Sequence, residues 1–586
     1  MKRRFTFLFA LITLGNICTA QTYVVVDTGQ TNCYNASGTV ISPPAANSVY
    51  YGQDAQFQNA PFSYHDNGDG TVSDLNTGLM WQQTTDTNRF TWADAVTYAA
   101  TNQLAGYTDW RLPEIKELVS LTLFYNATPT IFISTNYFTL WTPADFGLST
   151  EMGQTWANTI CCYKAAVTGN QGHWMFNFSD GHLKGNTKGP NWVRIVRGPI
   201  HGINNFVNNG DGTVTDLATG LMWQQADAGI GMDWTNALVY AKNLRTGGYA
   251  DWRLPNVKEL DSILDYTRGP DAVDPTKRSA AIDTNFFSCT LRSDTLGYYW
   301  TSTTAVGSGP GGNAYYVAFG EALAVTGVDT HGPGAIRTDP KVGDTASWTN
   351  GLGPSPSDVV CITNFVRCVR NATIAGFTAT PITGGAPLTV TFTDLSIGIL
   401  TNRSWSFGDG AITNTTATNL IHTYRFPSTN TVRLIGSGPG GLSTNVQANL
   451  VIATSVDTVG DGIPNWWRAQ YFPGSGGTNT NATSCATCDF TGTGQNNYFK
   501  YVADLNPTNP ASRLAIISIT TSNTNIQVTW TGGTNSWQYL ECSPVLTTNQ
   551  WLAIFTNVPP TSLTTNITHT GATAATNLFY RIKTRR

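Results

Sequence analysis

The feature that most constrains this fold is a long internal repeat. "GYTDWRLPEIKEL" from Gly106 to Leu118 recurs as "GYADWRLPNVKEL" from Gly248 to Leu260. "NGDGTVSDLNTGLMWQQ" from Asn67 recurs as "NGDGTVTDLATGLMWQQ" from Asn209. Matching residues are offset by 142 in both blocks, so the register holds without an insertion between them. This period is too long for a solenoid, whose repeats take about 20–50 residues. The sequence therefore predicts two related domains in tandem.

The second half of each copy diverges in length. "LWTP" at Leu140 aligns with "YWTS" at Tyr299, and "VRIVRG" at Val193 aligns with "VRCVRN" at Val366. The second copy carries an extra stretch around "GVDTHGPGAIRTDPKVGD". We predict a first domain over 21–200 and a second over 201–371.

Each copy has the pattern of an α+β domain. "NGDG" is a turn flanked by two short strands, because its glycines suit positive φ angles. "TWADAVTYAA" has apolar residues at helical spacing, and Thr91 is placed to cap that helix. "LPEIKELVSL" predicts a second helix that starts at Pro113 and turns Ile115, Leu118 and Val119 inward.

The DWRLP motif itself has a structural and a functional interpretation. Trp110 and Leu112 are expected to pack under the second helix. Arg111 lies between them, and a buried guanidinium needs several acceptors. Asp109 or Glu117 can supply some of these. The alternative is that this arginine contacts a ligand directly in both copies.

In combination, "NGDGTVTDLATGLMWQQ", "DWRLPNVKEL", "YWTSTT" and "FVRCVR" resemble the Lcl C-terminal domain family of collagen-like adhesins. The resemblance covers residues from about 60 to 200 and from about 201 to 371. It implies a C-type-lectin-like fold and adhesion to sulfated glycans. It also implies a disulfide between Cys289 and Cys368, although the first copy has Ile195 where Cys368 would lie.

Basic side chains late in the first copy are the candidates for contact with sulfated sugars. A negatively charged sugar needs cationic partners, and salt would weaken such contacts. The candidate ligand-binding residues are Lys184, Lys188, Arg194 and Arg197.

Residues 372–454 have a different pattern. "GAPLTVTFTDLS" alternates apolar and polar residues, as a strand with one buried face does. "WSFGDG" and "HTY" resemble the polycystic-kidney-disease (PKD) domain, which implies an immunoglobulin-like β-sandwich. Asp409 is expected to be a turn residue, and His422 a packing or hydrogen-bonding residue.

Residues 455–510 resemble a degenerate thrombospondin type-3-like or dockerin-like repeat. Calcium loops place oxygen ligands at alternate positions around a glycine. Asp457, Asp461 and Asp489 are the candidate ligands, so calcium is the one candidate cofactor. Position twelve of the first loop is Arg468 rather than Glu. The alternative is a compact linker closed by a Cys485–Cys488 disulfide.

Residues 511–586 predict a final small β-sandwich. "NIQVTWTGG", "SWQYLECS" and "LFYRIKTRR" are its strands. Trp530, Trp537 and Trp551 are expected in its core; two of them exposed in a row would instead stack on sugar rings. The predicted fold class is thus multidomain: two α+β C-type-lectin-like domains, a PKD-type sandwich and a small C-terminal β-sandwich.

The chain's ends and charge bear on its location. Lys2, Arg3 and Arg4 precede a short apolar run and a small-residue site at Cys18-Thr-Ala, which predicts a signal peptide over 1–20 and secretion. No later stretch is apolar enough to span a membrane. The formal net charge is −4 and only 12% of residues are charged, which argues against nucleic acid as a partner.

Sequence motifs give little support for an enzyme. GxSxG, HExxH and P-loop motifs are absent. The leading hypothesis is a secreted, non-catalytic binding protein whose partners are extracellular glycans or other cell-surface and matrix polymers. The first alternative is a structural scaffold of the cell surface or matrix. The second is a formylglycine-generating-type enzyme that uses Cys289 and Cys368.

Overall fold

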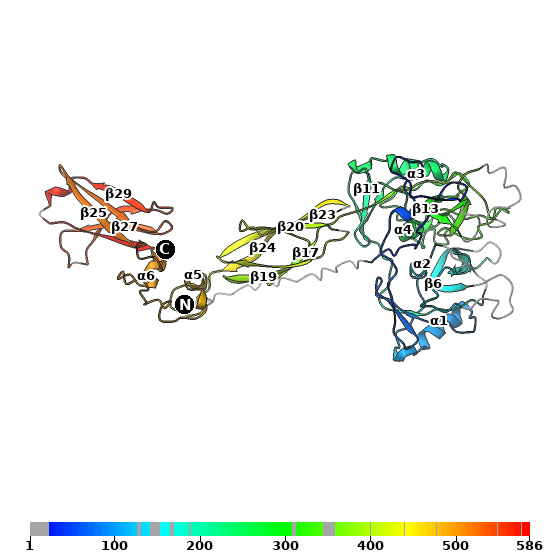
Figure 1. Ribbon diagram of the computed structural model, residues 1–586, viewed down its shortest axis with the longest axis horizontal. Helices are drawn as coiled ribbons and strands as arrows, with labels where there is room; N and C mark the ends of the chain where they lie inside the picture. The colour runs from blue at the N-terminus through cyan, green and yellow to red at the C-terminus, as the bar shows by residue number, and fades with distance from the viewer. Residues whose placement is uncertain are drawn as a thin grey trace, which may run out of the picture. The chain divides into compact units, whose positions relative to one another are not determined.

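The computed structural model describes residues 23–125, 131–140, 153–164, 169–186, 189–306, 312–343, 358–398, 400–438, 440–475, 477–547, 549–575 and 577–586. The chain divides into two compact units. One unit holds both repeat copies and ends at Ile374, apart from two short segments that return to it, and the other holds most of 375–586. Figure 1 draws the first copy in blue to cyan and the second in green.

The first unit contains four α-helices and sixteen strands within the described residues. The helices are α1 (Trp92–Thr101), α2 (Ile115–Ser120), α3 (Trp234–Asn243) and α4 (Val257–Ser262). The strands of the N-terminal segment and first copy are β1 (Cys33–Tyr34), β2 (Val40–Ile41), β3 (Tyr64–Asp66), β4 (Thr71–Asp74), β5 (Met80–Gln82), β6 (Gln154–Lys164), β7 (Gln171–Asn177), β8 (His182–Asn186) and β9 (Val196–Arg197). Those of the second copy are β10 (Phe206–Asn208), β11 (Thr213–Asp216), β12 (Leu221–Gln224), β13 (Tyr298–Ala305), β14 (Asn313–Ala318), β15 (Ile336–Pro340) and β16 (Val369–Asn371).

The predicted local elements of the repeat are present, with one shift. Thr91 caps α1 by accepting from the backbone of Asp94. α2 begins at Ile115 with Glu114 as its N-cap, so Pro113 lies just before the helix and not at its first position. A capping box between Glu114 and Glu117 fixes this start, because each satisfies a backbone N–H of the other.

The two copies share one sheet. Its order is β13-β14-β15-β8-β7-β6, so three strands come from each copy. The central pair is antiparallel, with Ile336 of β15 opposite Leu183 of β8. Each copy also has its own four-stranded sheet, β3-β4-β5-β9 or β10-β11-β12-β16. The repeat copies are therefore joined by backbone pairing and are not beads on a flexible linker.

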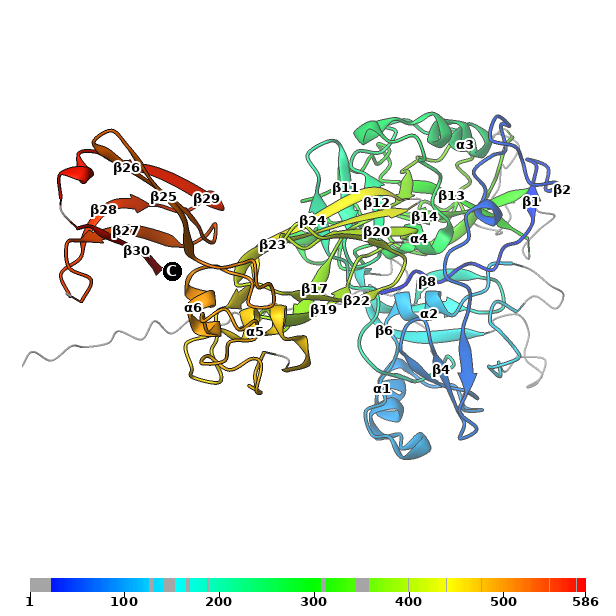
Figure 2. The ribbon, with the colours of Figure 1, turned by 60° about the vertical axis from the view of Figure 1, so that its left-hand side comes forward.

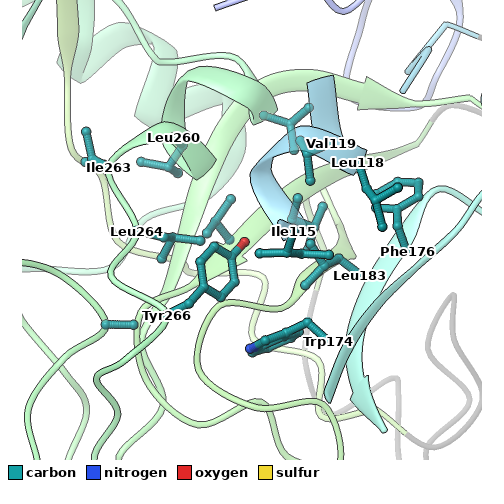
Figure 3. Close-up of a cluster of buried hydrophobic side chains, with 14 of the residues drawn as sticks. Ile115, Leu118, Val119, Trp174, Phe176, Leu183, Leu260, Ile263, Leu264 and Tyr266 are labelled. Carbon is teal, nitrogen blue, oxygen red and sulfur yellow. The ribbon is translucent and has the colours of Figure 1, made fainter. Parts of the chain in front are cut away.

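One hydrophobic core crosses the junction between the copies (Figure 3). Ile115, Leu118 and Val119 of α2 point into it, as predicted, and meet Leu260 of α4 and Tyr266. A second cluster belongs to the first copy alone and contains Ala95 and Ala99 of α1. Trp110 and Leu112 belong to that cluster. The expectation that they pack under the second helix was wrong. Trp110 and Leu112 lie in the core of the first copy, whereas Ile115 and the rest of the inward face of α2 lie in the core at the junction.

The structure also corrects the alignment of the second halves. Trp156 Nε1 donates to Phe90 O at 2.9 Å, and Trp300 Nε1 donates to Met232 O at 2.8 Å. Phe90 and Met232 are separated by the repeat offset of 142. Trp300 of "YWTS" therefore matches Trp156 of "QTWANT" and not the tryptophan of "LWTP", which lies outside the described residues.

The N-terminal segment, residues 23–60, packs largely on the second copy. Gln30 exchanges two hydrogen bonds with the backbone of Thr304, and Asn59 Nδ2 donates to Glu259 Oε1 at 3.0 Å. Tyr23 N donates to Ala218 O at 2.9 Å. The N-terminal segment thus precedes the first copy in sequence but packs on the second copy in the folded chain.

The second unit begins with a sandwich of two sheets (Figure 2, yellow-green). Their orders are β17-β19-β22 and β18-β24-β23-β20-β21. The strands are β17 (Phe377–Thr380), β18 (Thr383–Gly385), β19 (Leu388–Asp394), β20 (Asn402–Ser406), β21 (Ile412–Thr415), β22 (Asn419–Tyr424), β23 (Ser428–Gly438) and β24 (Gly441–Thr454). Asp409 accepts a hydrogen bond from His422 Nε2 at 2.7 Å, which orders the turn after "WSFG".

Two short helices and a last sandwich follow. The helices are α5 (Asn465–Tyr471) and α6 (Asn497–Val502). The sheets have the orders β25-β26-β29 and β28-β27-β30. Their strands are β25 (Ala515–Ser522), β26 (Asn525–Thr531), β27 (Trp537–Ser543), β28 (Leu552–Asn557), β29 (Thr564–His569) and β30 (Phe579–Arg585). The protein is thus multidomain and mostly β-sheet, with few helices.

Candidate functional site

A pocket opens at the junction of the two repeat copies. Its volume is about 400 Å³, within the range of small-ligand sites. Its lining comes from the first copy, from residues 200–206 at the boundary between the copies, and from the second copy. The lining residues are Glu114, Ile115, Lys116, Thr159, Ile200, His201, Gly202, Ile203, Asn204, Phe206, Ile263, Leu264, Asp265, Tyr266 and Asp283.

Acidic and apolar groups dominate this junction pocket. Glu114, Asp265 and Asp283 bring three carboxylates. Lys116 lies beside the same space, but its Nζ already donates to Ser262 O at 2.7 Å and has two longer oxygen contacts. Burial lowers the pKa of His201 to about 4, so this imidazole is neutral at pH 7. The pocket therefore favours neutral or cationic ligands over anionic ones.

The corresponding place in the second copy is filled by the chain itself. Val257 N donates to Thr303 Oγ1 at 3.0 Å, as Ile115 N donates to Thr159 Oγ1 at 2.9 Å in the first copy. Thr303 Oγ1 then donates to the carboxylate of Asp54 at 2.6 Å. Asp54 comes from the N-terminal segment and is buried, which raises its pKa to about 7. Residues 23–60 thus close the groove of the second copy, whereas the equivalent groove of the first copy is open.

Within DWRLPxxKEL, the arginine and glutamate form an internal ion pair. Arg111 donates to both carboxylate oxygens of Glu117 at 2.6 and 2.7 Å. Arg253 does the same with Glu259 at 2.6 Å for both bonds. Bidentate pairs of this kind fix geometry as well as contributing energy. The motif's arginines therefore hold α2 and α4 in place and do not face the junction pocket.

Two of the predicted ligand-binding residues have structural contacts instead. Arg194 is buried, and its guanidinium donates to the carbonyls of Gln82, Gln83 and Thr139. This corrects its assignment, because no face of the guanidinium is left for a sugar. Arg197 is bonded through Nε to Asp109 at 2.7 Å and lies over the ring of Tyr107.

The second copy repeats both arrangements. Arg367 donates to the carbonyls of Gln224, Gln225 and Ser288. Arg370 pairs with Asp251 and lies over Tyr249 at 3.8 Å from the ring centre. Because the same contacts occur twice, "VRxVR" is a folding motif of the repeat.

The structure does not describe the side chains of the two predicted lysines. Lys184 lies in β8, where its backbone is paired with Met175 of β7. Lys188 lies outside the described residues.

The cysteines follow one expectation and contradict another. Cys485 and Cys488 are joined in a disulfide. Cys289 and Cys368 are free thiols, which corrects the bond that the family resemblance implied. Cys289 packs at the edge of the junction core and its Sγ lies 3.2 Å from Tyr299 Oη, whereas Cys368 is fully buried in the second copy's separate core. The two thiols therefore face different clusters.

The first calcium-like loop does not fit a calcium ion. Arg468, at position twelve, donates to Asp461 Oδ1 at 2.6 Å and to the carbonyls of Ile463 and Gly477. Asp457 accepts from backbone N–H groups of its own loop, including that of Gly462. The guanidinium supplies the positive charge that a calcium ion would supply.

The second loop repeats this substitution with a lysine. Asp489 stands at position one and accepts from Gly494 N at 2.6 Å. Lys500, at position twelve, donates to Thr491 Oγ1 at 2.5 Å. Among the described residues, no group of three or more His, Cys, Asp or Glu side chains is arranged to hold a metal ion. The expected calcium ligands Asp457, Asp461 and Asp489 thus serve loops that are closed by protein cations.

Comparison with known proteins supports the prediction of two related domains in tandem. Two segments of the chain match the Lcl C-terminal domain family. They are residues 70–197 and 212–337, one in each copy. Both matched segments contain the DWRLPxxKEL motif and strands of the shared sheet, and the second segment ends within β15. No curated protein matches the chain.

Solved structures with partial similarity include two PKD domains and a carbohydrate-binding module. The PKD1 domain of Vibrio anguillarum Epp is 23% identical over 14% of this chain and 96% of its own, with a TM-score of 0.12. The PKD1 domain of the Vibrio cholerae metalloprotease PrtV is 22% identical over 14% and 99%, with a TM-score of 0.12. A β-sandwich carbohydrate-binding module is 14% identical over 36% and 91%, with a TM-score of 0.14. These scores support no inference about function.

Nothing in the described part of the chain has the form of a membrane-spanning helix.

Proposed function

We propose that this protein is a secreted, non-catalytic glycan-binding protein whose junction pocket holds one end of a sugar chain. The observation that carries the proposal is the open groove between the Lcl-type copies, whose counterpart is closed by residues 23–60. In this proposal the copies are lectin-like domains, and the sandwiches of 375–586 extend their reach.

The lining of the pocket suggests the class of sugar. Phe206 offers partly exposed aromatic surface, and rings of this kind combine apolar contact area with defined geometry. Asp283 offers carboxylate oxygens that accept hydrogen bonds from hydroxyl groups, whereas the Asp265 carboxylate is already paired with Arg268 Nε at 3.0 Å. A sulfated ring would bring a second negative charge next to these carboxylates. We therefore propose a neutral or amine-bearing sugar for this site, in place of the sulfated glycans that the family resemblance implies.

A glycan array with the full chain tests this proposal. Wild type and Phe206→Ala/Asp283→Asn are compared, with Asp274→Asn as the control, because Asp274 lies on an exposed turn of the second copy. Wild type and the control are expected to bind neutral glycans on the array, and the double variant is expected to lose this binding. Absence of all neutral and amine-bearing glycans from the wild-type signal would refute the proposal.

A scaffold function is the second candidate, and one observation favours it. The repeated motif supports the fold: Arg111 and Arg253 pair within their own copies, and the KEL lysines bond across the junction. If no glycan binds, the repeat has a purely structural explanation.

A formylglycine-generating-type activity has little support. Such chemistry needs reactive thiolates, which depend on a lowered thiol pKa. Burial raises the pKa of both Cys289 and Cys368.

A further inference from the structure

The outer face of the C-terminal β28-β27-β30 sheet combines aromatic and basic side chains. Directly opposite residues of antiparallel strands lie on the same face. Trp537 is opposite Arg585, Tyr539 is opposite Lys583, and Glu541 is opposite Arg581. The alternate residues Gln538 and Leu540 are buried, so the first set faces outward.

Trp537 and Phe579 are exposed aromatic residues on this face, with 39% and 37% of their surfaces accessible. Trp530 is fully buried and bonded to Gln538, as expected of a core residue. Trp551 is half-buried and lies under the guanidinium of Arg581 at 4.3 Å. The expectation that all three tryptophans are core is therefore correct for Trp530 only.

Two cations on the same face are not neutralised. Arg581 is paired with Glu541 at 2.7 Å. Lys583 and Arg585 are exposed and take part in none of the ion pairs found among the described residues. They occupy alternate positions of β30, about 6.6–6.8 Å apart along an extended strand.

The C-terminal segment differs from the whole chain in the sign of its net charge. Residues 511–586 contain five basic residues and one acidic residue, whereas the whole chain has a formal net charge of −4. This segment is thus net positive, whereas the chain as a whole is net negative. Such asymmetry indicates an anionic partner for that end.

We propose that the face formed by Trp537, Tyr539, Lys583 and Arg585 binds a uronate polysaccharide, a sugar polymer with one carboxylate on each ring. The aromatic side chains contact the apolar faces of the sugar rings, and the two cations pair with successive carboxylates. Two unpaired cations match a polymer of this modest charge density. This site lies outside the junction pocket and takes the opposite charge class of ligand.

Affinity electrophoresis of the full chain in gels containing polygalacturonate tests the site, with neutral dextran as the reference polymer. Lys583→Gln/Arg585→Gln should weaken polygalacturonate binding at least tenfold, a change of ~1.4 kcal/mol. Trp537→Ala should weaken binding severalfold, and Trp537→Phe should weaken it less, because a ring remains. The control is Arg425→Gln/Arg433→Gln, which removes two exposed charges from the preceding sandwich and should leave binding unchanged.

Three results would overturn the proposal. The first is unchanged binding in Lys583→Gln/Arg585→Gln. The second is an equal loss in the control, which would make net charge the cause. The third is binding of dextran sulfate or duplex DNA at least as tight as that of polygalacturonate, with no effect of Trp537→Ala, because the face would then act as a non-specific cation patch. Phe206→Ala/Asp283→Asn should bind polygalacturonate like wild type, which separates this site from the junction pocket.

Discussion

Lys116 and Lys258 exchange equivalent acceptors across the junction of the two copies. Lys116 Nζ donates to Ser262 O at 2.7 Å, and Lys258 Nζ donates to Ser120 O at 2.9 Å. Both lysines and both serines are separated by the repeat offset of 142. The lysine in the second half of each DWRLPxxKEL motif therefore recurs because it bonds across a pseudo-symmetric interface between the two copies.

The buried lysine of the second copy makes stability depend on pH. Burial lowers the pKa of Lys258 to about 7, below the ~10.4 of an unfolded lysine. Between these values the unfolded chain binds more protons, so this lysine makes the free energy of unfolding rise with pH, by up to about 1.4 kcal/mol per pH unit. We predict that Lys258→Met loses this contribution between pH 7 and 10. Urea unfolding at several pH values measures it.

Lys277→Met is the control for that experiment, because Lys277 ends a short surface turn of the same copy. Lys277→Met should retain the wild-type dependence of the free energy of unfolding on pH. A Lys258→Met protein with the wild-type pH slope would show that Lys258 stays charged in the folded state.

The two copies of the arginine–glutamate pair should differ in their contribution to stability. The side chain of Arg253 is 5% exposed, whereas that of Arg111 is 27% exposed. Removing one partner of a buried pair costs about 3–5 kcal/mol, because an uncompensated charge remains. We predict that Glu259→Gln destabilises the protein by about this much and Glu117→Gln by clearly less, as water can reach Arg111. Equal losses in chemical denaturation would contradict this difference.

The loops of residues 455–510 should be independent of calcium. Arg468 and Lys500 already place a cation in each loop. We predict that a chelator leaves the thermal unfolding of the full chain unchanged. In Arg468→Glu, added calcium should raise the melting temperature, because the twelfth position then carries the carboxylate that calcium loops use. A fall in the melting temperature of wild type with chelator would contradict the account.

The distribution of thiols gives a chemical test of the fold. Alkylation after unfolding without reductant should label Cys289 and Cys368, while Cys485 and Cys488 should be labelled only after reduction. Peptide mass mapping identifies which cysteines are alkylated before and after reduction. A peptide pair linked through Cys289 and Cys368 would restore the bond implied by the family resemblance.

Local elements of the repeat were predictable because their signals lie within a few residues. The Thr91 cap and the inward stripe Ile115, Leu118 and Val119 are set by the spacing of adjacent side chains. The sheet shared by the copies was not predicted, because its central pair, Leu183 and Ile336, is far apart in sequence.

The candidate site was the least predictable part. Basic residues were chosen for their charge, but Arg194 is enclosed by three carbonyls that only the folded chain brings together. The junction pocket depends on which copy the N-terminal segment covers, and no local pattern in 23–60 indicates this. Position twelve of the first calcium-like loop did carry a signal, since Arg468 replaces an acidic ligand.

The most direct test of the central claim is a calorimetric titration of the best neutral glycan from the array. The ligand is titrated into the full-length wild type, into Phe206→Ala/Asp283→Asn and into Lys583→Gln/Arg585→Gln. If the junction pocket is the glycan site, only the pocket variant loses affinity, by at least tenfold or ~1.4 kcal/mol. Equal affinity of the pocket variant and wild type would contradict the claim.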